Sequence, residues 1–181
     1  MTSLNRVFVL ALAALAVGLV AFFGARTIGD DGGGGGTVKV AEQGFTLDYP
    51  DTWTPISKEE LALYPGSPQL VLERDGNSGQ FVVRRESKAA PTQKSFGDEL
   101  DKEISDRVPD YQPGTVRTVK TAAGSAFYFS YARTKAGTAN SIVVVPDGSA
   151  SFVLESSSAA SDRDAAKDIA AMIGSFGINP S

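Results

Sequence analysis

The most apolar part of the chain is a continuous run near its N-terminus. Residues 7–25 read VFVLALAALAVGLVAFFGA, which is nineteen residues without a charge. At about 1.5 Å of rise per residue, a helix of that length nearly spans a hydrocarbon core of about 30 Å. We therefore expect residues 1–25 to form an N-terminal transmembrane helix that anchors the chain in the lipid bilayer through residues 7–25.

A cleaved secretion signal is the alternative for this segment. The apolar core of a signal peptide is usually about 7 to 15 residues long, and small residues precede its cleavage site. Here the run is longer, and Phe22 and Phe23 occupy the region where small residues would be needed. Arg6 before the run favours a cytoplasmic N-terminus, although Arg26 beyond it weakens that bias. The pattern favours a single-pass anchor in the cell membrane, with the remainder of the chain extracytoplasmic.

A glycine-rich segment follows the apolar run. Residues 26–36 end in DDGGGGG, which has no side chains suited to packing and very high backbone entropy. Flexible-coil statistics give a segment of this length a mean span of roughly 17 to 20 Å. We predict a flexible linker here, followed by one folded domain over residues 37–181 that lies close to the membrane surface.

Short runs of β-branched and aromatic residues, separated by turn residues, predict strands in that domain. The predicted strands cover residues 37–41, 45–49, 69–74, 80–86, 115–121, 126–133, 141–145 and 151–156. Phe127, Phe129 and Tyr131 alternate, so they should share one face of a sheet. Residues 142–145 are continuously apolar, as expected for a central strand covered on both faces.

Helical periodicity and capping residues mark three further segments. Ser57 and Glu60 form a capping-box pattern before a short helix that Pro65 and Gly66 end. The clearest helix is expected over residues 95–107, with Ser95 as its N-cap. Its apolar positions recur every four residues at Phe96, Leu100, Ile104 and Val108.

The last predicted helix covers residues 162–173, with Ser161 as N-cap and Gly174 just beyond its end. Strands therefore alternate with helices along the chain, and hairpin-length connections join the strands. This order predicts an α+β fold, in which an antiparallel sheet of about six to eight strands carries helices packed on its faces. The loop at residues 75–79 is expected to be a hairpin turn, because a calcium loop would need more alternating acidic ligands.

Composition removes several classes of chemistry. The chain contains no cysteine and no histidine, so thiol nucleophiles, thiolate zinc sites, imidazole bases and Ser/His/Asp triads are excluded. The net charge of −4 makes nucleic acid a poor partner. The basic residues Arg84, Arg85 and Lys88 form the one basic cluster, which we interpret as the solvated end of a strand.

Three short segments resemble the PsbP-like family. Residues 45–50, FTLDYP, followed by Trp53, are similar to that family's opening strand and its buried tryptophan. Residues 124–126 resemble the entry to its central hairpin, and residues 173–176, IGSF, resemble its closing helix. Thr52 departs from the pattern, since many members have glycine before the tryptophan.

The resemblance implies a PsbP-like α/β/α sandwich over most of the domain. It also implies a role in binding or assembly rather than catalysis, because that is the common theme of the family. It carries no catalytic, cofactor-binding or metal-binding residue over to this chain. Trp53 is expected to be a buried anchor for the first hairpin.

The leading hypothesis is a non-enzymatic, membrane-tethered accessory or protein-binding module that contacts an envelope protein. Two loops, at residues 65–68 and 109–113, each combine prolines with an adjacent aromatic residue, Tyr64 and Tyr111. Aromatic side chains are enriched in contact surfaces, and prolines limit the entropy lost on binding. Tyr64 and Tyr111 are therefore candidate partner contacts, with the covering of sheet edges as the alternative.

Two other function classes remain open at the level of sequence. One is a small-ligand or lipid-binding carrier with a cavity between the helix at residues 95–107 and the sheet. The other is a histidine-free hydrolase, using Ser57 with Lys58 or a carboxylate pair such as Asp48 and Asp51. The spacing of these residues supports neither arrangement, so we expect no enzyme activity and no cofactor.

Overall fold

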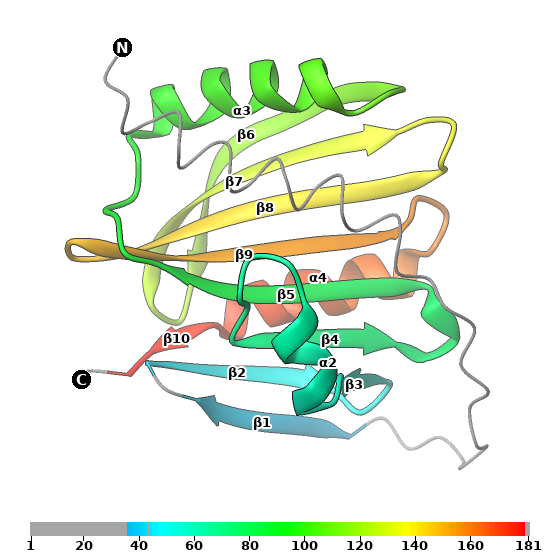
Figure 1. The fold of residues 1–181 in the computed structure, drawn as a ribbon, viewed down its shortest axis with the longest axis vertical. Coiled ribbons are helices and arrows are strands. Elements are labelled where there is room, and N and C mark those ends of the chain that lie inside the picture. The colour runs from blue at the N-terminus through cyan, green and yellow to red at the C-terminus, as the bar shows by residue number, and fades with distance from the viewer. Residues whose placement is uncertain (1–35, 43, 180–181) are drawn as a thin grey trace.

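The computed structural model describes residues 36–42 and 44–179 of the chain (Figure 1). The helices are α2 (Lys58–Leu63), α3 (Gln93–Arg107) and α4 (Arg163–Ser175), with a 3₁₀ turn η1 (Asp75–Asn77). The strands are β1 (Thr37–Glu42), β2 (Phe45–Pro50), β3 (Trp53–Pro55), β4 (Leu70–Arg74), β5 (Gly79–Glu86), β6 (Tyr111–Thr121), β7 (Gly124–Arg133), β8 (Thr138–Asp147), β9 (Ala150–Ala159) and β10 (Gly177–Ile178).

The predicted anchor and linker, residues 1–25 and 26–36, lie outside the described residues except for Gly36. Within the described part of the chain, no helix combines the length and the apolar character needed to cross a bilayer.

Seven of the described strands form one antiparallel sheet in the order β3-β4-β5-β9-β8-β7-β6. Hairpins join most neighbours, and the long-range pairing of β5 with β9 connects the two halves of this sheet. The predicted antiparallel sheet with helices on its faces is thus confirmed. A second sheet, β1-β2-β10, differs from the single antiparallel sheet that the sequence predicts.

The two faces of the seven-stranded sheet are covered by different elements (Figure 1). Alternation along β9 directs Phe152 and Leu154 to one face, where they pack with α4 and with β2 of the small sheet. Val153 points to the opposite face, which is covered by α3. Helix α2 lies on that same face over β4 and β5. We call these surfaces the α4 face and the α3 face.

Aromatic side chains fill the core on the α4 face. Phe45, Phe152 and Phe176 are fully buried, and their ring centroids lie 5.3 to 5.9 Å apart. Trp53 is 1% exposed, as expected of an anchor, and its indole Nε1 donates to Asp168 Oδ2 at 3.0 Å. The start of β3, which follows the first hairpin, is thereby fixed to α4.

The predicted stripe of α3 packs on the α3 face. Phe96, Leu100, Ile104 and Val108 are buried against a cluster that includes Phe129 and Tyr131. The helix begins two residues earlier than predicted, because Thr92 rather than Ser95 accepts the capping hydrogen bond. Helix α4 is likewise capped by Asp162 instead of Ser161.

Three further predictions about the ends of helices and about a turn can be compared with the structure. The capping box of Ser57 and Glu60 is present at the start of α2. At the other end of the chain Gly174 lies inside α4, which continues to Ser175, so its expected position beyond the helix was wrong. The residues between β4 and β5 form a 3₁₀ turn with Gly76 at φ 73°, so the turn interpretation was correct.

Candidate binding surfaces

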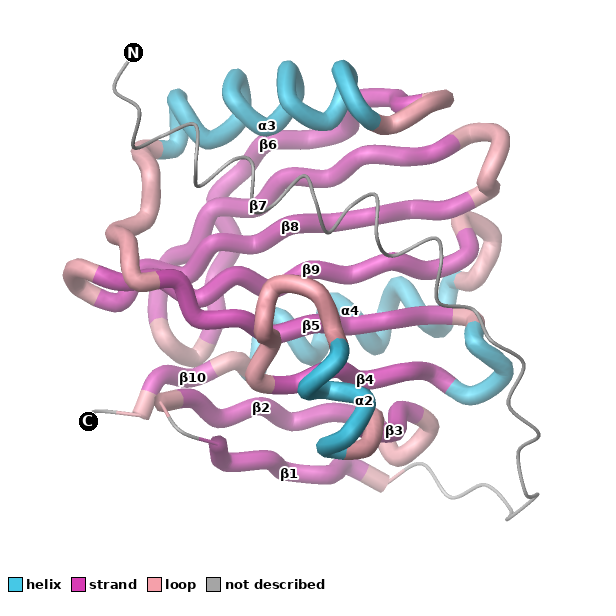
Figure 2. Tube along the Cα trace, in the orientation of Figure 1, coloured by secondary structure: helices cyan, strands magenta, loops and turns pink. Residues whose placement is uncertain are grey.

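Tyr64 caps the C-terminal end of α2 and packs with Val71 of β4 and Val82 of β5 on the α3 face. The chain that leaves α2 crosses over β5 (Figure 2). The Tyr64 side chain is buried at 8% exposure, and its hydroxyl donates to Gln80 Oε1 at 2.8 Å. Burial is the main reason why the pKa of Tyr64 is raised well above its usual value. Tyr64 therefore anchors the loop, whereas Pro65, Gly66 and Ser67 after it are exposed.

Beneath this region the structure contains a buried ion pair that the sequence analysis missed. Arg84 is 2% exposed, and its guanidinium donates to the carboxylate of Glu155, which is 3% exposed. The assignment of Arg84 to a solvated strand end was wrong. β5 pairs with β9, so the Arg84 side chain lies next to an acidic residue 71 positions away. Arg85, the next residue, faces outward and pairs with Asp147 at 2.7 Å.

Burial dominates the ionisation of Glu155. It raises the pKa of this carboxyl from 4.5 to about 7, and the positive charge of Arg84 opposes the shift. Glu155 Oε2 and Arg84 Nε are buried without a hydrogen-bond partner. A carboxyl with such a pKa can serve as a general base. Its burial at 3% exposure and its pairing with Arg84 are more consistent with a structural ion pair.

Tyr111 lies at the start of β6, after the turn that leaves α3. Its hydroxyl donates to Asp101 on α3, and its ring packs on Tyr131 with centroids 5.7 Å apart. Burial and the hydrogen bond to Asp101 raise the pKa of Tyr111. Like Tyr64, it is held by the domain rather than projecting from it, while Pro109, Gln112 and Pro113 are exposed.

Both loops contain a non-glycine residue with a left-handed backbone conformation. Ser67 has φ 47° and Asp110 has φ 60°, and no other non-glycine residue of the described chain has a positive φ. The carboxylate of Asp110 accepts from the backbone N–H of Lys135 at 2.7 Å and of Ala136 at 3.1 Å. Such conformations persist where surrounding contacts impose them, and they cluster at functional sites.

A groove of about 150 Å³ opens on the α4 face, between α4 and the β6–β7 hairpin. Ala166, Ala170 and Gly174 form its helical wall, and Val119 and Tyr128 are on its strand wall. Arg117 and Lys120 also line it. The guanidinium of Arg117 lies 4.7 Å from the centroid of the Tyr128 ring. This groove combines apolar walls with two basic side chains.

The residues considered for a histidine-free hydrolase have structural partners. The hydroxyl of Ser57 donates to Glu60 Oε2 at 2.7 Å within the capping box. Asp48 pairs with Lys39 at 3.6 Å, and Asp51 accepts from the Gly36 N–H at 2.9 Å. Among the described residues, no group of three or more acidic side chains is placed to hold a metal ion.

Comparison with solved structures defines the fold. No protein-family model matches this chain, and no curated protein sequence matches it. The solution structure of cyanobacterial PsbP (CyanoP) from Synechocystis is similar with a TM-score of 0.58 and 14% identity, covering 84% of this chain and 99% of that chain. The crystal structure of LpqN, involved in cell envelope biogenesis of Mycobacterium tuberculosis, is similar with a TM-score of 0.51 and 19% identity, covering 80% of this chain and 91% of that chain.

The chain is thus an α+β protein in which helices cover both faces of an antiparallel sheet. More narrowly, the described domain has the PsbP-like fold, as the resemblance of its three short segments implied. The agreement with these structures concerns the fold, because the sequence identity is low.

Proposed function

We propose that this protein is a non-catalytic accessory module, tethered to the cell membrane, whose extracytoplasmic domain binds an envelope protein. Residues 7–25 would span the bilayer with the N-terminus in the cytoplasm, and residues 26–36 would link the anchor to the domain. The fold shared with LpqN, a protein involved in cell envelope biogenesis, supports this placement.

The observation that carries the proposal is the geometry of the two proline-containing loops. Ser67 and Asp110 hold the loops in left-handed backbone conformations, and Tyr64 and Tyr111 fix the loop ends to the domain. A loop already held in one conformation loses little entropy when it binds. The exposed residues next to each tyrosine, rather than the tyrosine rings, would then form the contact.

A binding role also fits what the described residues lack. Three polar side chains that could act as nucleophile or base have structural partners: Ser57 in its capping box, Asp48 with Lys39, and Glu155 buried against Arg84. The large exposed apolar side chains, Val38, Leu63 and Val116, lie on three separate elements. These observations support contact through the exposed polar residues of the loops.

Site-specific photo-crosslinking in cells tests the proposal with the full chain. A photoreactive residue placed at Ser67 or at Pro109, both exposed, should give a discrete adduct with one envelope protein. The same probe at exposed Ala171 on α4 is the matched control and should not give that adduct. Equal adducts at all three positions, or none at the loops, would contradict docking through these loops.

Among the described residues, the observation that favours the carrier alternative is the groove on the α4 face. Its volume of about 150 Å³ is small. Pockets that enclose a drug-sized ligand usually measure about 300 to 1,000 Å³. The groove could hold part of a ligand, such as one charged headgroup, but not a complete lipid. This size limit favours a surface contact over carriage.

A further inference from the structure

We propose that the groove between α4 and the β6–β7 hairpin docks onto the phosphate headgroups of anionic phospholipids at the membrane surface. This inference rests on the proposed tethering, because the anchor is what brings the domain near the bilayer. It adds a second membrane contact, which would set the orientation of the domain.

The walls of the groove are mainly apolar. Ala166, Ala170 and Gly174 follow each other at intervals of four residues, so they form one stripe along α4 without long side chains. Val119 and Tyr128 face this stripe from the strands. The upper parts of the acyl chains would supply the matching apolar groups next to the phosphate.

Four basic residues flank the groove. Arg117 and Lys120 line it from β6. Arg163 and Lys167 precede Ala166 and Ala170 by three residues, which places them on the adjoining surface of α4. Strands β6 and β7 contain no acidic residue. A local positive surface is therefore built into a chain whose net charge is −4.

These cations differ from most arginines of the domain in having no acidic partner. Arg74, Arg84, Arg85, Arg107 and Arg133 are all within 4.0 Å of a carboxylate. Within the described part of the chain, no ion pair involves Arg117, Lys120, Arg163 or Lys167. On α4 itself, Asp168 is engaged by Trp53 and Arg74, and the exposed Asp164 in the first turn forms no ion pair with any of the four basic residues. The four basic groups are thus free to meet an external anion.

Arg117 is held in a position suited to phosphate. Its guanidinium carbon lies over the Tyr128 ring, 4.7 Å from the centroid, and this cation–π contact restricts where the guanidinium can be placed. A guanidinium edge matches two phosphate oxygens, so it binds phosphate with defined geometry. Lys120 adds a mobile positive charge next to it.

Because the tether holds the domain near the bilayer, even a weak affinity of the groove for headgroups would keep the groove bound much of the time. A linker of about the length of residues 26–36 holds the domain at an effective concentration in the millimolar range at the bilayer surface. Lys and Arg residues near an anionic leaflet each add attraction that decays within a Debye length. If the α4 face meets the membrane, the α3 face, with the loop of Tyr64, points away from it toward a protein partner.

Thiol accessibility in reconstituted vesicles tests the inference. The chain has no native cysteine, so Ala170→Cys gives one reactive thiol inside the groove. The full chain is reconstituted into vesicles of phosphatidylcholine, with or without phosphatidylglycerol, and treated with a membrane-impermeant thiol reagent. Leu63→Cys on α2, where the native side chain is 79% exposed, is the control site on the opposite face.

We expect phosphatidylglycerol to slow labelling of Cys at position 170 by about fivefold, which corresponds to a groove covered about four-fifths of the time. Salt at about 1 M, where the Debye length is about 3 Å, should restore the rate. Labelling at position 63 should not change. Equal rates in both vesicle types, or parallel slowing at both positions, would overturn the proposal.

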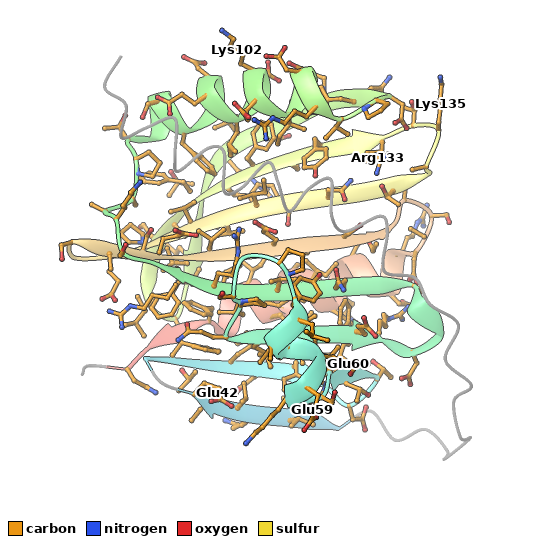
Figure 3. The ribbon with its side chains drawn as sticks, viewed as in Figure 1. Glu42, Glu59, Glu60, Lys102, Arg133 and Lys135 are labelled. Carbon is orange, nitrogen blue, oxygen red and sulfur yellow. The ribbon has the colours of Figure 1, made fainter. Side chains whose placement is uncertain are left out.

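Charge variants separate the groove from a general charge effect. Arg117→Gln with Lys120→Gln should abolish the protection. Lys102→Gln with Lys135→Gln removes the same amount of charge from α3 and from the β7–β8 turn (Figure 3). This control pair should retain the protection of the thiol at position 170. Protection lost equally in both pairs would overturn a specific site. Thermal melting should show that each pair remains folded.

Two further arms identify the source of the anion and the step that fails. Inorganic phosphate is added to phosphatidylcholine vesicles, where it should give no protection. Protection by phosphate alone would assign the groove to a free anion and reject the lipid headgroup. Flotation with phosphatidylcholine vesicles tests the membrane anchor separately. A chain that floats with these vesicles but shows no protection on phosphatidylglycerol vesicles refutes only the groove contact. A chain that does not float refutes the membrane tether.

Discussion

At the residue scale, Trp53 connects the start of β3 to the C-terminal helix α4. Its indole is 1% exposed and donates to Asp168 of α4. Trp53→Ala should lower the free energy of unfolding by about 3 to 5 kcal/mol, the usual range for emptying a buried aromatic site. Denaturant unfolding of wild type and variant measures this difference. An unchanged midpoint would show that the ring contributes little to the core.

Trp53→Phe is the matched control for that experiment. It keeps an aromatic ring in the site and removes the hydrogen bond to Asp168, so it should cost less than the alanine variant, about 1 to 2 kcal/mol. A phenylalanine variant as unstable as the alanine variant would assign most of the effect to the loss of the polar contact.

The buried pair of Arg84 and Glu155 makes a prediction about pH. The pKa of Glu155 is raised from 4.5 to about 7, mainly by burial, so above pH 4.5 the unfolded chain releases this proton more readily. The free energy of unfolding should therefore fall as pH rises from about 4.5 to 7, by up to about 3 kcal/mol. Chemical denaturation across this range measures it.

Glu155→Gln should remove that slope whatever its effect on absolute stability, because the amide does not titrate. The other groups with shifted pKa values affect stability outside the range from about pH 4.5 to 7. The pKa of Asp162 is lowered, first by the hydrogen bond from the Ala165 N–H, so the stability it contributes is lost below its unfolded pKa. The raised pKa values of Tyr64 and Tyr131 concern alkaline pH. A slope that persists in the glutamine variant would refute the assignment to Glu155.

At the element scale, α3 approaches β6 closely at Gly97. A Cβ added at Gly97 would lie 2.9 Å from one methyl carbon of Val116 and 3.1 Å from the other. Glycine inside a helix is otherwise unfavourable by about 1 kcal/mol relative to alanine. We expect the clash to exceed that gain, so Gly97→Ala should destabilise the domain by about 1 kcal/mol.

A double-mutant cycle tests this close approach. In a Val116→Ala background the obstructing methyl groups are absent, so Gly97→Ala should become stabilising by about 0.5 to 1 kcal/mol. The sign of the Gly97→Ala effect should thus reverse between the two backgrounds, as measured by thermal or denaturant unfolding. The same sign in both would mean that α3 and β6 adjust freely at this position.

Elements with strong local patterns could be predicted from sequence, and those made by distant pairing could not. The residues Phe96, Leu100, Ile104 and Val108 recur every four positions and are buried together as expected. Their spacing along one helix is a local property of the sequence, so it could be recognised without knowing which strands the helix covers. The small sheet depends on Gly177 and Ile178 pairing with Thr46 and Phe45. No local signal indicates a strand of two residues that forms only against a partner far away in the chain.

The candidate surfaces show the same limit. Tyr64 and Tyr111 were selected for the prolines beside them, and the structure fixes both hydroxyls to other elements. Their role in a partner contact remains a prediction. The Arg84–Glu155 pair was missed because the two residues are adjacent only through the pairing of β5 with β9. The one hint in the sequence is that Glu155 follows three apolar residues, 152–154, within the predicted strand 151–156.

At the scale of the whole molecule, the point where the domain begins is well defined. The Gly36 N–H donates to Asp51 Oδ2 at 2.9 Å, and the Asp51 N–H donates to the Gly36 carbonyl at 3.0 Å. β1 then pairs along its full length with β2, from Thr37 with Pro50 to Glu42 with Phe45. Backbone bonded in this way resists proteolysis, whereas a glycine-rich linker is a preferred cleavage site.

If the domain is extracytoplasmic and tethered, a broad-specificity protease added to intact spheroplasts should release a fragment that begins between residues 26 and 36. The fragment should stay resistant, since Gly36, the first described residue, is already hydrogen-bonded to Asp51. Mass spectrometry of the released fragment locates its N-terminus, and a cytoplasmic marker protein must remain intact as the control. Complete protection until the cells are permeabilised would place the domain in the cytoplasm and contradict the topology. A soluble protein that starts near residue 26 without added protease would instead show that residues 1–25 are a cleaved signal.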